Sequence, residues 1–215
     1  MLIEHKNLSV WVTWLTKLLT GENSCEWAAW FRTHVRSYRK VPNDFNALKW
    51  QLEHTNALNA LLKRIEAPGR SAFIEDQNHF TLRGSTAALS GKPDLVAYSG
   101  TTGAIYDVKT GRSSPSHVMQ VMIYMYALPR ATKRYQGMSF EGIVAYADHQ
   151  VRIPNSAIDG MFVAHLSQLV RRIADDAPAR RVPSQRECRF CPITTIDCPD
   201  RATSEVSAIG WTQDF

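Results

Sequence analysis

Two short segments near the middle of the chain carry acidic and basic side chains at a spacing that suits metal-assisted hydrolysis. Asp94 lies in GKPDLVAY, and Asp107 and Lys109 lie in IYDVKTG. Residues two apart on a strand point to the same face, so Asp107 and Lys109 share one face. Folding the two segments as a hairpin about Thr101 places position 94 opposite position 108. This brings Asp94 beside Asp107.

Two neighbouring carboxylates favour a bound cation. They repel each other unless a cation lies between them, and their oxygen atoms suit Mg²⁺ or Mn²⁺. Lys109 beside them is suited to hold an attacking water or to offset the charge that develops on a phosphate. The alternative is a solvated strand face with an ordinary Asp–Lys pair, because D-x-K alone is a common pattern.

The four cysteines, Cys25, Cys188, Cys191 and Cys198, form a second group. The last three lie in CRFCPITTIDC, a C-x2-C-x6-C spacing. In a reducing compartment, thiolates are soft ligands for zinc or for an iron–sulfur cluster. Three ligands leave such a site incomplete, and Cys25 is the only cysteine left to complete it. The spacing alone does not choose between zinc and iron–sulfur, and unrelated free thiols are a third alternative.

Helices are predicted to dominate the first 66 residues. Apolar side chains recur at helical spacing over residues 8–20 and 24–40. A third helix is predicted to open at Asp44 as N-cap and to stop before Pro68. Its apolar face is predicted to comprise Trp50, Ala57, Leu58, Leu61 and Ile65. His54 lies on that same face, where it is either a satisfied core histidine or an inward-pointing metal ligand.

Short strands are predicted from residue 71 onward, and the tail from residue 177 is predicted to be irregular. The clearest strand pair is joined by SGTTG, which suits a five-residue hairpin loop. This order of elements predicts an α/β (α+β) fold with a mixed central sheet flanked by helices. The predicted strands cover residues 93–98, 104–109, 142–147 and 150–153, and the predicted helices cover 116–128, ending at Pro129, and 156–175.

The segments GKPDLV, IYDVKTGR and QVMIY together resemble the PD-(D/E)XK nuclease superfamily, in particular its RecB-like branch. The similarity spans about residues 50–130. It implies a divalent-metal-dependent deoxyribonuclease with a restriction-endonuclease-like core. The site residues that it implies are the metal ligands His54, Asp94, Asp107 and Val108 (through its carbonyl), the water-orienting Lys109, and the DNA-positioning Gln120 and Tyr124. Two positions depart from the family pattern, because Trp50 replaces a small residue and Leu58 replaces an acid.

The cysteines add a further resemblance. A branch of RecB-like nucleases, including CRISPR-associated exonucleases and AddB-type helicase–nucleases, has one cysteine before the nuclease core and three after it. Those four hold a [4Fe–4S] cluster that attaches the C-terminal tail to the N-terminal helices. This chain has the same arrangement, so the resemblance implies a [4Fe–4S] cluster, with zinc as the alternative. Such a cross-link would stabilise the fold by restricting the unfolded chain.

The balance of 25 Lys and Arg against 20 Asp and Glu gives a net charge of +5, which suits a polyanionic partner such as DNA. The basic side chains predicted to contact DNA phosphates are Arg32, Arg36, Arg112, His117, Arg186 and Arg189. The alternative for each of them is a solvated surface residue. The sequence contains no Walker A loop and no helicase motif, so any unwinding would come from a partner helicase. A CRISPR integrase complex is a second predicted partner.

With 44% apolar residues, the 215-residue chain is predicted to form a single nuclease domain, 1–215. Its parts would be a helical segment (1–66), the nuclease core (71–175) and a cysteine-bearing tail (177–215) docked on the N-terminal helices. No membrane span or signal peptide is predicted, which favours the cytoplasm. The resemblance implies an exonuclease on single-stranded DNA or duplex ends, in repair, recombination or CRISPR spacer acquisition. The alternative is a non-catalytic DNA-end-binding subunit, which a broken catalytic set would favour.

Overall fold

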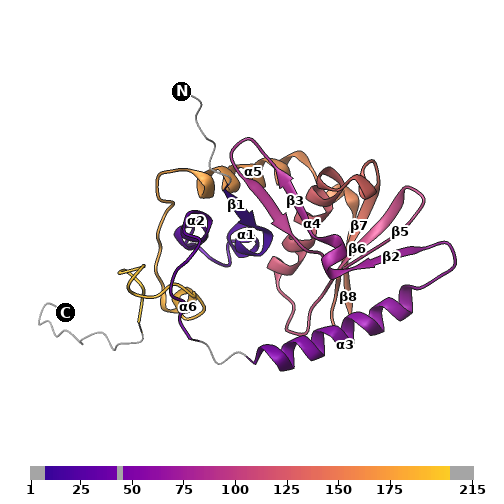
Figure 1. Ribbon diagram of the computed structural model, residues 1–215, viewed down its shortest axis with the longest axis horizontal. Helices are drawn as coiled ribbons and strands as arrows, with labels where there is room; N and C mark the ends of the chain where they lie inside the picture. The colour runs from indigo at the N-terminus through magenta and orange to yellow at the C-terminus, as the bar shows by residue number, and fades with distance from the viewer. Residues whose placement is uncertain (1–7, 43–45, 204–215) are drawn as a thin grey trace, which may run out of the picture.

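The computed structural model describes residues 8–42 and 46–203, and Figure 1 shows how their helices and strands are arranged. The strands are β1 (Ser9–Trp11), β2 (Ser71–Ile74), β3 (Phe80–Arg83), β4 (Ala88–Gly91), β5 (Leu95–Ser99), β6 (Thr102–Val108), β7 (Ser139–Ala145) and β8 (Gln150–Ile153). The helices are α1 (Val12–Leu19), α2 (Trp27–His34), α3 (Ala47–Ile65), α4 (Pro115–Ala131), α5 (Gly160–Ala174) and α6 (Gln185–Cys188). Short 3-10 helices are η1 (Glu75–Asn78), η2 (Lys133–Tyr135) and η3 (Asn155–Ala157). Within the described ranges, no helix is both long enough and apolar enough to cross a membrane.

A five-stranded mixed sheet forms the centre of the molecule. Its order is β2-β5-β6-β7-β8, in which only β6 and β7 are parallel. The chain passes from β6 to β7 through α4, the kind of crossover that a parallel pair requires. A smaller sheet has the order β1-β4-β3, and α4 packs against strands of both sheets. These mixed sheets flanked by helices confirm the predicted fold class.

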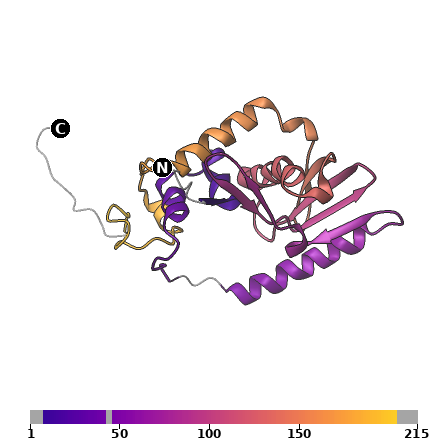
Figure 2. The same cartoon turned by 45° about the horizontal axis from the view of Figure 1, so that its top comes forward.

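Helices lie on both faces of the five-stranded sheet, as Figures 1 and 2 show. On one face, Leu58 and Leu61 of α3 pack with Ala104 and Tyr106 of β6. On the other face, Ile105 of β6 packs in the core that includes α4. Because side chains alternate along a strand, Asp107 shares its side with Ile105 and faces α4. The strand therefore directs this carboxylate toward the helix that carries Gln120.

Several element boundaries differ from the predictions. The helix α4 continues through Pro129 to Ala131, although the sequence predicted that it would end at Pro129. Proline removes one N–H donor, and the buried apolar residues of this last turn hold the helix together without it. Residues 9–11 form strand β1 beside β4 instead of a first helical turn. The helix α2 ends at His34 instead of reaching residue 40.

The start of α3 also differs from the prediction. The predicted N-cap Asp44 lies outside the described residues. The side chain of Asn46 accepts a hydrogen bond from the Lys49 N–H at 2.9 Å and serves as the N-cap of this helix. From there α3 runs to Ile65, close to the predicted end.

The irregular tail packs on the N-terminal helices. Ile193 is fully buried against Trp27 and Phe31 of α2. The Trp27 N–H donates a hydrogen bond to the Arg180 carbonyl at 3.0 Å, and Lys40 forms an isolated antiparallel bridge with Ile193. These contacts hold the segment that carries three cysteines beside α2.

Candidate active site and cysteine cavity

The residues of the acid–lysine motifs line one cavity of about 600 Å³. The elements around it are the β5–β6 hairpin, α3, α4 and the start of α1. The sequence-predicted residues in its lining are His54, Asp94, Asp107, Val108, Lys109, His117, Gln120 and Tyr124. Residues from four separate segments of the chain therefore meet in one space.

The β5–β6 hairpin aligns the two acidic residues with a tighter turn than the sequence predicted. Leu95 pairs with Tyr106, so the register places Asp94 across from Asp107 and not from Val108. The turn contains two residues, and Gly100 adopts a φ of 60°, which glycine tolerates without steric cost. The predicted five-residue loop is wrong, and its register is displaced by one residue. The two carboxylates nevertheless remain neighbours.

Asp94 connects the hairpin to α3. Its Oδ2 accepts a hydrogen bond from the Val108 backbone N–H at 2.7 Å and lies 3.2 Å from Nε2 of His54. The hydrogen bond to Asp94 raises the pKa of His54, while burial opposes that rise. The ring of Trp50 stacks on the imidazole with centroids 5.0 Å apart. His54 is thus fixed between a carboxylate and an aromatic ring.

Asp107 is the most buried acidic group of the site, with 1% of its surface exposed. Its Oδ1 accepts a hydrogen bond from Gln120 Nε2 at 2.9 Å. Its Oδ2 forms an ion pair with Lys109, whose Nζ lies 2.7 Å away. Burial raises the pKa of Asp107 to about 6, although the Lys109 charge lowers it. The Lys109 ammonium is therefore the cation that offsets the charge of this buried carboxylate.

Gln120 and Tyr124 complete the network from α4. They lie four residues apart on one helix face, and Gln120 Nε2 donates to the Tyr124 hydroxyl at 2.9 Å. Gln120 Oε1 accepts a hydrogen bond from Lys109 Nζ at 3.0 Å. Burial raises the pKa of Tyr124, which keeps its hydroxyl neutral. Gln120 thereby orients Asp107 and Lys109 at the same time.

The donor atoms of this cavity fit a divalent cation. Carboxylate oxygens, an imidazole nitrogen and a backbone carbonyl are ligands that Mg²⁺ and Mn²⁺ accept. Across residues 8–42 and 46–203, however, no group of three or more His, Cys, Asp or Glu side chains is arranged to hold a metal ion as it stands. Binding would therefore require the side chains to draw together and Lys109 to move away from Asp107.

The predicted DNA-contacting residues have different surroundings. His117 lines the cavity with Nδ1 2.9 Å from the Tyr146 hydroxyl, and burial lowers its pKa. Arg32 lies over the ring of Trp14 at 4.9 Å, so it belongs to the interior more than to an open basic surface. The remaining predicted contacts, Arg36, Arg112, Arg186 and Arg189, are exposed.

Several side chains around the site have contacts or an exposure that the residue pattern did not predict. Trp50 was predicted to lie in the core, but it is 43% exposed and lines the cavity together with Trp11. Glu22 binds the start of α4, and no local pattern reveals a contact across 94 positions. Glu75 donates its N–H to the Asp94 carbonyl at 2.8 Å from a left-handed conformation, with a φ of 43°. Its carboxylate also raises the pKa of His54.

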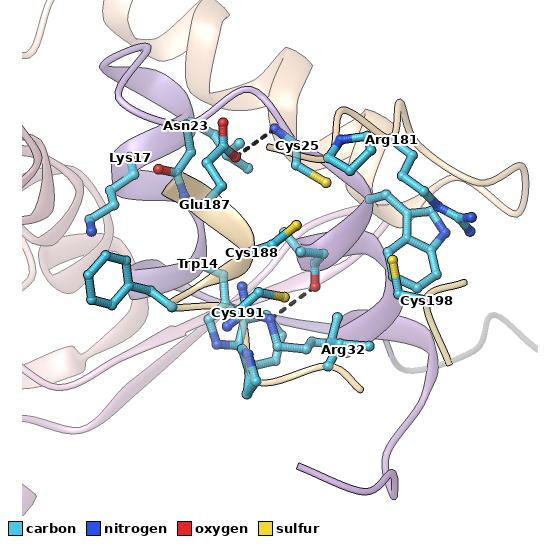
Figure 3. Close-up of a pocket in the computed structure, with 18 of the residues that line it drawn as sticks. Trp14, Lys17, Asn23, Cys25, Arg32, Arg181, Glu187, Cys188, Cys191 and Cys198 are labelled. Atoms are coloured by element: carbon cyan, nitrogen blue, oxygen red, sulfur yellow. Dashed lines mark hydrogen bonds between the residues drawn. The ribbon is translucent and has the colours of Figure 1, made fainter. Parts of the chain in front are cut away.

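A second cavity, of about 270 Å³, is lined by all four cysteines. Figure 3 shows Cys25, Cys188, Cys191 and Cys198 around the same space. The four are free thiols. Burial raises the pKa of Cys198, Arg181 lowers it, and the three other thiols are near enough to raise it further. Four thiols therefore line one cavity, although within residues 8–42 and 46–203 they are not grouped closely enough to hold a metal ion as they stand.

Charged side chains support the backbone around this cysteine cavity. The Glu187 carboxylate accepts hydrogen bonds from the N–H groups of Ser24 and Cys25 at 3.0 and 3.1 Å. The Arg201 guanidinium donates to the carbonyls of Cys188, Cys191 and Ile193 at 2.6 to 2.8 Å. Glu187 therefore joins the segment of Cys25 to α6, and Arg201 holds together the tail backbone that carries Cys188 and Cys191.

The fold and the candidate site share three features that are typical of metal-dependent nucleases. A mixed sheet carries a carboxylate hairpin with an adjacent lysine, and a following helix supplies Gln120 and Tyr124. Residues 13–199 match the sequence model of the PD-(D/E)XK nuclease superfamily. The chain belongs to that superfamily, whose members are nucleases that hydrolyse phosphodiester bonds.

The other comparisons add little. None of the curated proteins matches the chain. Among solved structures, the crystal structure of SSO0001 is similar at 16% sequence identity, covering 94% of this chain and 91% of that one, with a TM-score of 0.46.

Proposed function

We propose that this protein is a divalent-metal-dependent deoxyribonuclease that degrades single-stranded DNA or duplex ends as an exonuclease. The observation that carries the proposal is a single cavity in which His54 Nε2 lies 3.2 Å from Asp94 Oδ2 and the buried Asp107 lies 2.7 Å from Lys109 Nζ. The Asp94 charge raises the pKa of Asp107, so a cation beside the two carboxylates would stabilise their charged forms. Acidic oxygens beside an imidazole nitrogen support a divalent metal ion such as Mg²⁺ or Mn²⁺ as that cation.

Each residue of the cavity has a proposed role. His54, Asp94, Asp107 and the Val108 carbonyl would hold Mg²⁺ or Mn²⁺. Such an ion would supply Lewis-acid stabilisation of the phosphodiester and would lower the pKa of water. Lys109 would orient the attacking water and offset the negative charge that develops on the phosphate.

The α4 side chains would act by positioning. Gln120 would hold Lys109 in place through the hydrogen bond at 3.0 Å, and Tyr124 would fix Gln120. His117 would contact a phosphate from the same cavity. The exposed residues Arg36, Arg112, Arg186 and Arg189 would add salt-dependent phosphate contacts.

The test is cleavage of end-labelled linear single strands, blunt duplexes and covalently closed single-stranded circles, with Mn²⁺ or with EDTA. An exonuclease cuts the linear strands and spares the circles. Lys109→Ala is expected to lose at least about a hundredfold in rate, the usual scale for a lost proton-handling or charge-stabilising group. Lys133→Ala is the matched control, because Lys133 is an exposed lysine on η2.

Two outcomes would count against the proposal. Equal rates for wild type and Lys109→Ala would exclude this site as the source of the activity. DNA binding without cleavage by the wild type would favour the alternative, a non-catalytic DNA-end-binding subunit of a larger complex.

The cysteine cavity is proposed to hold a [4Fe–4S] cluster, which would place the chain in the iron–sulfur branch of RecB-like nucleases. Its support is the convergence of Cys25 with the three tail cysteines. Anaerobically purified protein should contain iron and sulfide and absorb visible light, and Cys198→Ala should lose all three properties. Colourless protein that contains stoichiometric zinc would show that the four cysteines hold zinc and not an iron–sulfur cluster.

The domain organisation and partners follow from the same proposal. Residues 1–215 would form one nuclease domain, in which the tail 177–215 is joined to the segment 1–66 through the cluster and the core 71–175 carries the chemistry. The cluster would require a reducing compartment, consistent with a cytoplasmic enzyme of repair, recombination or CRISPR spacer acquisition. A helicase or a CRISPR integrase complex would supply the DNA ends.

A further inference from the structure

Two tryptophans present exposed surface at the candidate active site. Trp11, at the end of β1, and Trp50, on α3, both line the cavity that contains Asp94 and Asp107. They are 39% and 43% exposed. Two partly exposed indoles that line one cavity offer aromatic surface to a ligand bound there.

Neighbouring structure holds both rings in place. Trp50 stacks on His54 with an interplanar angle of 27° and a centroid distance of 5.0 Å. Trp11 belongs to a strand that pairs with β4 at Ser90, and its ring lies 5.9 Å from that of His79. Fixed rings lose little conformational freedom when they bind a flat partner. The two rings therefore form prepared contact surfaces on separate elements of the fold.

The charges of the same cavity indicate which flat partner fits. Lys92 and Lys109 line it, each in an ion pair, Lys92 with Asp76 at 3.0 Å and Lys109 with Asp107 at 2.7 Å. With a divalent cation at Asp94 and Asp107, as proposed above, the cavity would suit a polyanionic backbone. Aromatic rings combined with cations along a groove are the usual means of binding single-stranded nucleic acid, because unpaired bases offer free faces for stacking. Bases in a duplex are already stacked on each other and offer no such face.

We infer that Trp11 and Trp50 form a nucleobase-stacking subsite that binds unpaired nucleotides next to the scissile phosphate. The subsite selects single-stranded DNA over blunt duplex DNA. This inference rests on the proposed function and specifies its substrate. Trp11 and Trp50 are specificity-determining residues, whereas the acidic residues and Lys109 carry the chemistry.

The first arm of the test measures DNA binding with divalent metal ions withheld, so that no strand is cut. Fluorescently labelled single strands and blunt duplexes are titrated with wild type, Trp11→Ala and Trp50→Ala. Each alanine variant should bind single strands about tenfold more weakly, which lies within the range for one lost base stack. Duplex binding should stay within about twofold. Trp11→Phe and Trp50→Phe retain an aromatic ring and should recover most of the affinity.

The second arm separates stacking from a structural role of Trp50 beside His54. Single strands that carry one abasic site at successive positions are bound by wild type and by each alanine variant. At the stacked position, the abasic site should weaken wild-type binding by about the same factor as the alanine substitution. An alanine variant that binds the strand with this abasic site should lose no more affinity than either change causes alone, because both changes remove the same contact.

Several results would overturn the subsite. One is that the alanine variants weaken single-strand and duplex binding equally. Another is that the effects of the variant and of the abasic site add at every position. A third is that the wild type does not bind single strands. Metal-dependent cleavage that is insensitive to both alanine substitutions would remove the subsite and leave the proposed nuclease intact. Single-strand binding that depends on both tryptophans, without cleavage under any metal, would retain the subsite and remove the nuclease.

Discussion

Glu22 anchors the start of α4, and its substitution by glutamine should loosen the helix that carries Gln120 and Tyr124. The Glu22 carboxylate accepts hydrogen bonds from the Ser116 N–H at 2.8 Å and from the Ser114 hydroxyl at 2.9 and 3.0 Å. The Ser116 hydroxyl donates to it at 3.2 Å. A negative charge at this position also complements the positive end of the helix dipole.

The expected loss for Glu22→Gln follows from these contacts. Hydrogen bonds to a charged group contribute about 1.5–3 kcal/mol and those to a neutral group about 0.5–1.5 kcal/mol, so losing the charge costs on the order of 1 kcal/mol. The helix-dipole interaction adds about 0.3–1 kcal/mol. Because the side chain is only partly buried, solvent screening limits the sum to about 1–2 kcal/mol. For a chain of this size the Tm should fall by about 2–8 °C.

The difference in stability between wild type and Glu22→Gln should become smaller in acid. Burial tends to raise the pKa of Glu22, but the hydrogen bonds from Ser114, Ser116 and Thr20 outweigh burial and hold that pKa below 4.5. A pKa that is lower in the folded state than in the unfolded state stabilises the fold above the unfolded pKa. The difference between wild type and Glu22→Gln should therefore be full at pH 7 and shrink as the pH falls below about 4.5.

Chemical denaturation followed by circular dichroism, at pH 7 and at acidic pH, measures this difference. Glu53→Gln is the matched control, because Glu53 forms an exposed ion pair with Lys49 at 3.9 Å and should change stability by less than about 0.5 kcal/mol. Equal stability of Glu22→Gln and wild type at pH 7 would refute the reasoning. A stability gap that stays constant into acid would refute the role of the charge.

Two further substitutions test the packing of β7 against α4 and the backbone contacts of the cysteine-bearing tail. Gly142→Ala should destabilise the fold by about 1–3 kcal/mol in denaturation, because its Cβ would lie 2.5 Å from Val121 Cγ1 and 2.6 Å from Met125 Sδ. Gly160→Ala, whose Cβ meets open space, should leave the denaturation midpoint unchanged or raise it, and an equal effect of both changes would contradict this account. Arg201→Lys should increase protease cleavage of the tail, because one ammonium group cannot reproduce three guanidinium contacts to carbonyls. Unchanged cleavage would show that these contacts are dispensable.

Local spacing was sufficient to predict the centre of the site. Residues two apart on a strand share a face, which places Asp107 and Lys109 together, and residues four apart on a helix align Gln120 with Tyr124. The apolar face of α3 also predicted correctly that His54 would point inward, where it is 8% exposed. These relations follow from the periodicity of strands and helices, so they can be predicted from residue spacing without the folded structure.

Long-range and boundary features were not predictable in the same way. The hairpin register depends on whether Gly100 takes a left-handed conformation, and SGTTG permits more than one turn. The exposure of Trp50 depends on what packs against the start of α3, which periodicity does not determine. The Glu22 contact joins residues from distant parts of the chain. Such features arise from tertiary packing and became visible only in the folded structure.

The most direct test of the central claim is the rate of cleavage of a labelled linear single strand as a function of Mn²⁺ concentration, for wild type and Asp94→Asn. The wild type should show no cleavage without the metal and a saturable rise with it. Asp94→Asn should require much higher Mn²⁺ or lose at least about a hundredfold in rate, because it would remove the charge of a proposed metal ligand. Cleavage by the wild type without any divalent ion, or the same Mn²⁺ dependence in both proteins, would contradict the account.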